Sequence, residues 1–262
     1  MSNDIQSASS TLNIEYDSNQ IRSSFFSRII AFFRNDIDTK HVDLQLIAFG
    51  FETGVVDVMS YKDFSVFVSN QTGNTVFFGA RIAGQSSAAY SLICASLFGF
   101  LITGFISGQV GHRIGNKRRW WLICNTCFQT ILIFVVIILM SKKTILPTDS
   151  NAYILVLLLS ISYGCQVAMA KHLSCPEIPT AVVTSPFIDL LSDPKLFKRH
   201  NVPRNRRFFY ILLFLIGIIV GSFSYKKMSS EFTLGIAGVV KALVAISFFF
   251  NPKTNSQSEA SE

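Results

Sequence analysis

Hydrophobic residues in this 262-residue chain gather into long blocks instead of alternating with polar ones. Four blocks of 18 to 23 residues contain no charged side chain, and they run from Ala88 to Val110, Trp120 to Met140, Ala152 to Ala170 and Phe208 to Tyr225. A helix of about 20 apolar residues crosses the hydrocarbon of a lipid bilayer. The pattern therefore predicts a helical protein that is embedded in a lipid bilayer and crosses it several times.

Four weaker apolar segments decide how often the chain crosses. Two are continuous except for isolated charges, namely Leu44 to Tyr61 with Glu52 and Asp57, and Phe232 to Phe250 with Lys241. Two are broken, one by "SNQTGNT" between Phe64 and Gly84 and one by three prolines between Leu173 and Leu191. We expect the first two to span and the broken two to enter and leave on one side. The predicted fold class is an all-α integral membrane protein with about six transmembrane helices and two short broken or re-entrant segments.

The order of these segments repeats, which predicts an internal duplication. Half-repeats of about 44–140 and 152–250 each contain a span, a broken segment and two further spans. "VSNQTGNTVFF" (68–78) resembles "AVVTSPFIDLL" (181–191) when the two breaks are aligned, and Gly50 and Gly164 precede them at similar distances. Three spans in each half predict a 3+3 inverted repeat, which is a common plan of secondary transporters.

One span in each half carries a pair of glycines four residues apart. The pairs are Gly104/Gly108 and Gly217/Gly221. Small residues at this spacing let helices approach closely in lipid. These faces are therefore candidates for helix packing and for an oligomer interface.

Basic residues between the spans predict the orientation. With six spans, the N-terminal tail (1–40), the loops 112–119 and 192–207 and the C-terminal tail (251–262) share one basic side, as cytosolic segments do. Eight spans would move the loop 112–119 outside, so we favour six, with both termini cytosolic. Residues 21–34 have one apolar face, which is typical of a helix lying on the membrane surface or packed on the protein's own cytosolic face. Spans of 18 or 19 residues favour the thinner endoplasmic reticulum or Golgi membrane over the plasma membrane.

The composition excludes several other classes of protein. Only 15% of residues are charged, against about a quarter in soluble domains. The net charge of +7 comes from loops beside spans, so we expect no nucleic-acid partner. The four histidines and five cysteines have no metal-site spacing, and HExxH, GxSxG and P-loop motifs are missing. We expect no metal, no cofactor and no enzymatic activity.

Several stretches are similar to a known family. In "GFETGVVDVMSYKDFSVFVSNQTGNTVFFG" (50–79), Gly54 or Gly50, Asp57 and the triplet Thr72-Gly73-Asn74 resemble the first signature of the YoaK-type transmembrane family of bacteria and fungi. "GNKRRWW" (115–121) resembles the basic turn of this family. Residues 177–197, followed by residues 205–221, resemble its second signature in the fungal form. Val58 departs from the alanine that is common there. The resemblance covers about residues 40–250 and implies a multi-pass membrane protein of unestablished activity and no stated substrate.

Polar residues inside the apolar segments are the candidate site. Carboxylates within a membrane usually face a cavity or a partner, and unwound backbone there is tolerated only inside protein or beside water. We predict a site for a small solute or ion between the two breaks. Its candidate residues are Glu52, Asp57, Asn70, Gln71, Thr72, Gly73, Asn74, Gln166, Thr184, Ser185 and Asp189.

Simpler interpretations stay open for each of these groups. Asp57 would lie at the interface with Lys62 or Asp63 if its helix ended early. The first break would be an ordinary loop that caps a helix through Asn74 or Thr75. Lys171 and Lys241 would both extend their long side chains to the membrane surface.

The sequence leaves two candidate functions. One is a small transporter or permease, and the other is a non-transporting membrane scaffold or assembly factor that docks a partner or anionic lipid on the loop 192–207.

Overall fold

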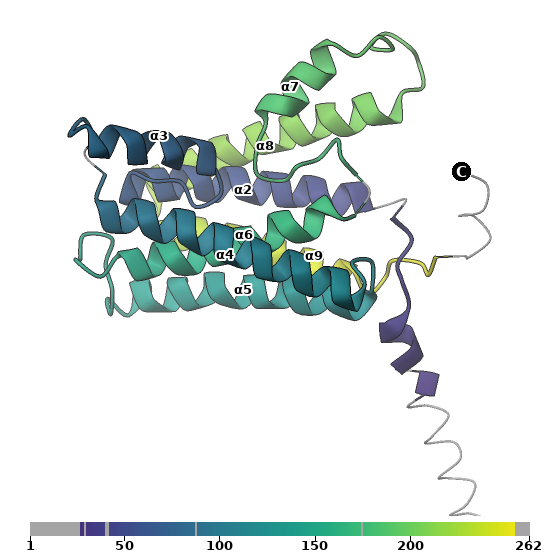
Figure 1. Cartoon of the computed structure of the whole chain (residues 1–262), viewed down its shortest axis with the longest axis horizontal. Coiled ribbons are helices and arrows are strands. Elements are labelled where there is room, and N and C mark those ends of the chain that lie inside the picture. Colours follow the sequence, from purple (N-terminus) through teal and green to yellow (C-terminus); the bar gives the residue numbers. More distant parts are fainter. Residues whose placement is uncertain (1–26, 29, 40–41, 87, 174, 255–262) are drawn as a thin grey trace, which may run out of the picture.

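The computed structural model describes residues 27–28, 30–39, 42–86, 88–173 and 175–254 (Figure 1). Half of the surface helix expected near 21–34 lies outside these residues, and the described part, 27–28 and 30–34, is helical. The described residues form helices and contain no strand, apart from two isolated bridges. These bridges pair Asp36 with Arg118 and Ile37 with Lys253, so they tie the N-terminal segment to one end of the helices. The all-α prediction is confirmed.

Five helices of the described residues are long and apolar enough to cross a membrane. They are α4 (Tyr90–Ile114), α5 (Arg119–Ser141), α6 (Tyr153–Lys171), α8 (Val202–Lys227) and α9 (Ser230–Ser247). The four uncharged blocks and the segment containing Lys241 fall in these helices. The sixth predicted span forms α2 (Val42–Phe64), whose 23 residues are long enough but carry five charged side chains. Glu52 and Asp57 are buried inside the protein, so α2 is surrounded by neighbouring helices and not by lipid alone.

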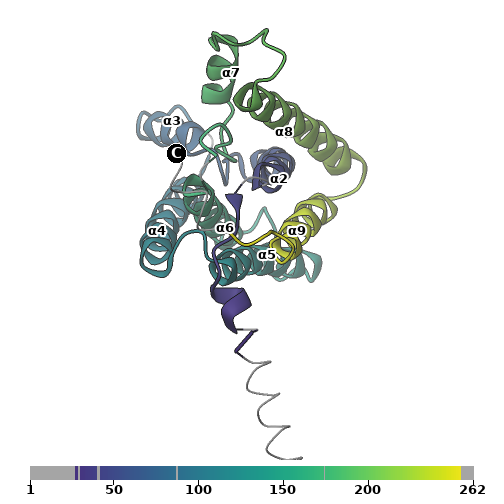
Figure 2. The ribbon, with the colours of Figure 1, turned by 90° about the vertical axis from the view of Figure 1, so that its right-hand side faces the viewer.

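The packing places α2 and α6 towards the centre when the molecule is viewed end-on (Figure 2). α2 packs along α8 and α9, α6 packs along α4 and α5, and α5 packs against α9. Two crossings depend on glycine. An added Cβ at Gly217 would collide with the carbonyl oxygen of Phe51 on α2, and one at Gly164 with that of Phe100 on α4. The helices therefore approach backbone to backbone at these two points.

The glycine pairs contribute mainly to these internal crossings. Gly217 and Gly221 both lie against the backbone of α2, and Gly104 lies opposite Gly164 of α6. Only Gly108 of the four faces open space. Three of the four glycines considered for an oligomer interface thus already pack against other helices of the same chain.

Both broken segments contain a short half-helix preceded by non-helical chain with bends and turns (Figure 1). α3 (Gln71–Ile82) packs on α4 at the end of the molecule where α2 finishes, and α7 (Thr184–Leu191) packs on α8 at the opposite end. A residue with left-handed backbone precedes each half-helix, Ser65 with φ 57° and Thr180 with φ 62°. These turns redirect the chain, so that α3 and α7 each begin near the middle of the molecule and run outward.

Candidate functional site

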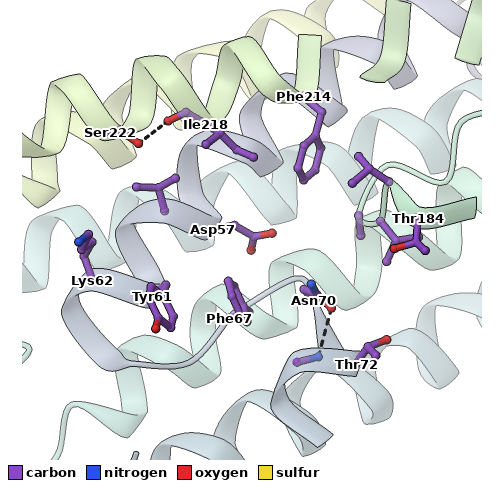
Figure 3. A pocket seen from close by; sticks show the side chains of 15 residues that line it. Asp57, Tyr61, Lys62, Phe67, Asn70, Thr72, Thr184, Phe214, Ile218 and Ser222 are labelled. Atoms are coloured by element: carbon purple, nitrogen blue, oxygen red, sulfur yellow. Dashed lines mark hydrogen bonds between the residues drawn. The ribbon is translucent and has the colours of Figure 1, made fainter. Parts of the chain in front are cut away.

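A cavity of about 640 Å³ lies where the two broken segments meet (Figure 3). One wall comes from α2 and α8, and the other from the start of α3 and the residues just before α7. The polar or charged lining residues are Asp57, Tyr61, Lys62, Asn70, Thr72, Thr184 and Ser222, and the others are Val58, Phe67, Gly73, Ala181, Val182, Val183, Phe214 and Ile218. The structure therefore brings residues of both breaks to one cavity.

Asp57 is the acidic group of this cavity, and its carboxylate points into it (Figure 3). Both carboxylate oxygens accept the hydroxyl of Ser69, at 2.8 and 2.7 Å. Asp57 is 8% exposed and forms no ion pair with any described residue. The interface interpretation is wrong, because α2 continues to Phe64 and Asp63 instead accepts a hydrogen bond from Tyr225 at the end of α8.

Asn74 holds the first break in shape. Its side chain is fully buried, accepts from the amide of Phe67 at 2.9 Å and donates to the carbonyl of Phe67 at 2.7 Å. It also donates to Gln71 Oε1 at 2.9 Å and to Ser96 Oγ of α4 at 2.8 Å. The N-cap of α3 is Asn70, which accepts from the amide of Gly73 at 3.3 Å, and not Asn74 or Thr75. Asn74 and Gln71 thus satisfy buried backbone groups that the broken helix leaves open.

The first break also supplies cavity wall. Asn70, Thr72 and Gly73 line the cavity, whereas Gln71 and Asn74, which were predicted with them, do not. Ser69, which belongs to the predicted polar break but was not among its candidate site residues, donates a hydrogen bond to Asp57. A serine twelve residues after a buried aspartate has no recognisable spacing, so only the fold of the break reveals the pair.

The second break contributes less than predicted. Thr184 lines the cavity together with the backbone just before it. Ser185 and Asp189 are exposed and do not line it, and Asp189 instead borders a separate hollow beside the loop 192–201. The direction of α7 explains this difference. The helix runs away from the cavity, so the side chains after its first residue, Thr184, lie outside the cavity.

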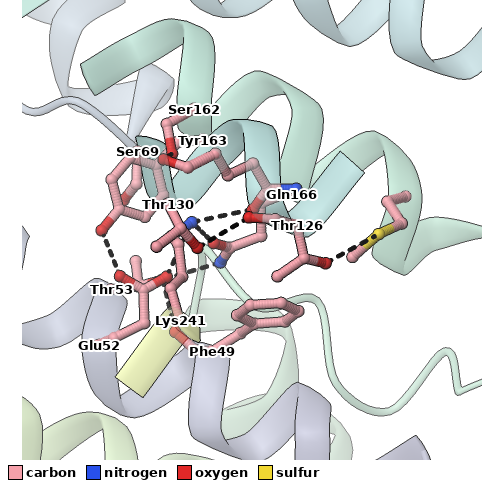
Figure 4. Close-up of polar contacts among 12 residues, drawn as sticks. Phe49, Glu52, Thr53, Ser69, Thr126, Thr130, Ser162, Tyr163, Gln166 and Lys241 are labelled. Carbon is pink, nitrogen blue, oxygen red and sulfur yellow. Dashed lines mark hydrogen bonds and ion pairs between the residues drawn. The ribbon is translucent and has the colours of Figure 1, made fainter. Parts of the chain in front are cut away.

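Glu52 and Gln166 belong to a second polar cluster, which is closed off inside the protein (Figure 4). Glu52 Oε1 lies 3.2 Å from Lys241 Nζ, with both side chains fully buried. Tyr163 donates to Glu52 Oε2 at 2.6 Å. The predicted extension of Lys241 to the membrane surface is therefore wrong. Lys171 differs, because it is the last residue of α6 and is exposed.

Amides complete the surroundings of Lys241. Its ammonium group donates to Gln129 Oε1 of α5 at 3.0 Å and to Gln166 Oε1 of α6. Gln166 in turn donates to Thr53 Oγ1 of α2 at 3.1 Å. Together with the ion pair to Glu52, the ammonium group thus has three polar neighbours, as a buried cation needs. The cluster therefore joins α2, α5, α6 and α9. Opposite charges within apolar segments were the sequence signal for such a pair, but they did not tell whether Glu52 or Asp57 is the partner of Lys241.

The loop between α7 and α8 is organised around Asp193. Asn201 donates to Asp193 Oδ2 at 2.9 Å, the amide of Lys195 donates to Oδ1 at 2.8 Å, and Arg207 lies 3.5 Å away. These hydrogen bonds, that from Asn201 above all, lower the pKa of the Asp193 carboxyl from its ordinary value. Arg204 bonds the carbonyls of Leu196 and Lys198. Much of the basic charge predicted as a docking surface is thus used to fold the loop itself.

Five apolar spans, two half-helices and buried polar clusters define a multi-pass α-helical membrane protein. The chain belongs to the family described as "Protein of unknown function (DUF1275)", whose model matches residues 45–247. It is 28% identical over 181 residues to the UPF0700 transmembrane protein YoaK of Bacillus subtilis (strain 168), covering 64% of this chain and 76% of that protein. The YoaK-type resemblance is confirmed. No solved structure matches the chain.

Proposed function

We propose that this protein is a small transporter or permease, and that its solute site is the cavity beside Asp57. The observation that carries the proposal is that both broken segments and a buried carboxylate line one cavity. Discontinuous helices that meet near the middle of a membrane commonly form transporter binding sites, because their ends leave polar groups free for a solute. The proposal involves no enzymatic step.

The proposal includes an inverted 3+3 repeat, which the pattern of helix packing supports. When α2, α3, α4 and α5 are exchanged with α6, α7, α8 and α9, the packing of α2 on α8 becomes that of α6 on α4. Likewise, α2 on α9 becomes α6 on α5, and α3 on α4 becomes α7 on α8. The glycine crossings correspond as well, with Gly54 against Gly217 in one and Gly164 against Gly104 in the other. This pairs Gly164 with Gly54, and not with Gly50 as the sequence alignment has it.

In this proposal, α2 is the sixth span. It runs antiparallel to α4 and α6 and is as long as α5 (Figure 1). Both termini and the loops 112–119 and 192–207 then share the basic, cytosolic side. The shorter spans, 19 residues in α6 and 18 in α9, favour an endoplasmic reticulum or Golgi membrane.

Solute flux into proteoliposomes tests the proposal. We expect purified protein to move a solute, and Asp57→Asn to abolish the flux while the protein stays folded. Asp189→Asn is the matched control, since it removes an exposed carboxylate outside the cavity. Normal flux through the Asp57→Asn variant would exclude the proposed site.

A scaffold is the second candidate function, and the loop between α7 and α8 is the observation that favours it. Phe197 is 95% exposed, and its neighbours Lys195, Lys198 and Arg199 are exposed too. Exposed basic and aromatic side chains beside a membrane suit anionic lipid or a partner. A stoichiometric crosslinked partner that is lost on changing these three basic residues to glutamine, with no flux in liposomes, would favour the scaffold over the transporter.

A further inference from the structure

The charge of the cavity limits what can bind there. Asp57 is its only carboxylate, and within the described residues no lysine or arginine pairs with it. Lys62 lines the same cavity from an exposed position, and Figure 3 shows it pointing away from the Asp57 carboxylate. By contrast, the other deeply buried acid, Glu52, has its own lysine. Of the two deeply buried acids among the described residues, Asp57 is thus the one without a basic partner.

The walls around the carboxylate are mainly aromatic and aliphatic. Phe67 and Phe214 flank Asp57 in Figure 3, and the Phe67 ring stacks on Tyr61 with centroids 5.3 Å apart. Aromatic faces attract organic cations, most strongly where water is excluded. A calcium ion needs six to eight oxygen ligands, and magnesium usually keeps several waters. Because apolar groups form so much of this wall, it suits the carbon surface of an organic ion better than a bare metal ion.

From these two features we infer that the cavity binds a small organic cation, an alkylammonium or quaternary ammonium, with Asp57 as its counter-ion. This inference rests on the proposed function for the role of the site, and it adds the chemical class of the solute. The ammonium group lies against the carboxylate, and its carbon substituents lie against Phe67 and Phe214. Thr72 and Thr184 are placed to bond a polar substituent of the solute (Figure 3).

A proton competes with the cation for the same carboxylate. Other titratable groups near Asp57 are Glu52, Tyr61 and Lys62 on α2, Tyr163 on α6 and Tyr210 on α8. Tyr163 and Tyr210 are buried and hydrogen-bonded, to Glu52 and to the carbonyl of Val182. Asp57 is the only carboxylate among the residues that line the cavity, so its protonation removes the negative charge that the cation would face. Binding of a cation therefore weakens as the pH falls, by up to about tenfold per pH unit once the carboxyl is protonated.

Charge-matched probes test the inference. Choline, its neutral isostere 3,3-dimethylbutan-1-ol and the anion 3,3-dimethylbutanoate have nearly the same shape. We expect purified wild-type protein in detergent to bind choline but neither of the others. Asp57→Asn should abolish choline binding, and Asp189→Asn should leave it unchanged. Phe214→Leu, which keeps an apolar wall without the aromatic face, should weaken it by about two- to tenfold.

Each outcome separates the inference from the proposed function. Absence of choline binding to folded wild-type protein, equal binding of the alcohol, or unchanged binding by Asp57→Asn would overturn the cation inference. Flux in proteoliposomes tests the proposed function by itself. Flux of the neutral or anionic probe alone would keep a transporter and reject a cation site, whereas choline binding without flux of any probe would keep the cation site and reject transport.

Discussion

Glu52 on α2 and Lys241 on α9 form an ion pair with a 3.2 Å separation, although 189 positions separate them in the chain and neither side chain reaches solvent. Tyr163, Gln129 and Gln166 supply the remaining hydrogen bonds. A buried pair of this kind gains less from attraction than it costs to desolvate, but the loss of either partner leaves an uncompensated charge. The pair therefore fixes the position of α2 relative to α6 and α9, and with it the direction of the Asp57 side chain on α2.

Single replacements in this pair should be far more damaging than the double replacement. We expect Glu52→Gln or Lys241→Met to lower the free energy of unfolding by about 3–5 kcal/mol, and the double variant to recover much of that loss. Denaturant unfolding in detergent measures all four proteins. Additive losses would show that the two charges are not coupled.

Asn74 should be needed for the shape of the first break. Asn74→Asp removes the donors to Phe67, Gln71 and Ser96 with little change in volume. Each lost hydrogen bond contributes about 0.5–1.5 kcal/mol to stability, so we expect a clear loss of thermal stability and of solute binding. Thr75→Ala is the control, since Thr75 is exposed and bonds only a carbonyl of its own helix. Wild-type behaviour of Asn74→Asp would refute the role.

A single methyl group added at the α4–α6 crossing should lower the stability of the protein. At Gly164 an added Cβ meets the carbonyl of Phe100 and the hydroxyl of Thr103, and backbone atoms cannot move aside cheaply. We expect Gly164→Ala to destabilise the protein by about 1–3 kcal/mol, whereas Gly108→Ala on α4, which faces open space, should be neutral. Melting temperatures in detergent compare the two, and equal values would contradict the close crossing.

The loop between α7 and α8 should loosen in acid. Because hydrogen bonds from Asn201 and Lys195 lower the pKa of Asp193 in the folded state, the ionised carboxyl stabilises the loop fully above its unfolded pKa of about 3.9. That contribution is lost as the pH falls through the lower folded-state pKa. The protection of the backbone amides of residues 193–201, measured relative to their intrinsic exchange rates, should therefore fall in this range. Asp193→Asn should remove this loss of protection, and its persistence in that variant would assign it to another group.

Features set by solvation were predictable from the sequence, and features set by long-range geometry were not. Uncharged blocks have to be helices in lipid, so the spans follow from hydropathy alone. Asp57 and the first break were found because polar groups inside apolar segments need a reason. The partner of Lys241 was missed because no local spacing links α9 to α2. Asp189 was wrongly placed with Thr184 because the outward direction of α7 depends on its packing against α8.

Cysteine accessibility at Thr72 tests the central claim most directly, because a transporter's site must be reachable from both sides of the membrane. Thr72→Cys, in a background whose five native cysteines are replaced, is exposed to a membrane-impermeant thiol reagent added from either side of sealed vesicles. We predict labelling from both sides, slowed by a bound solute. Labelling from one side only, with no change when solutes are added, would contradict a transport site at the meeting of the two breaks.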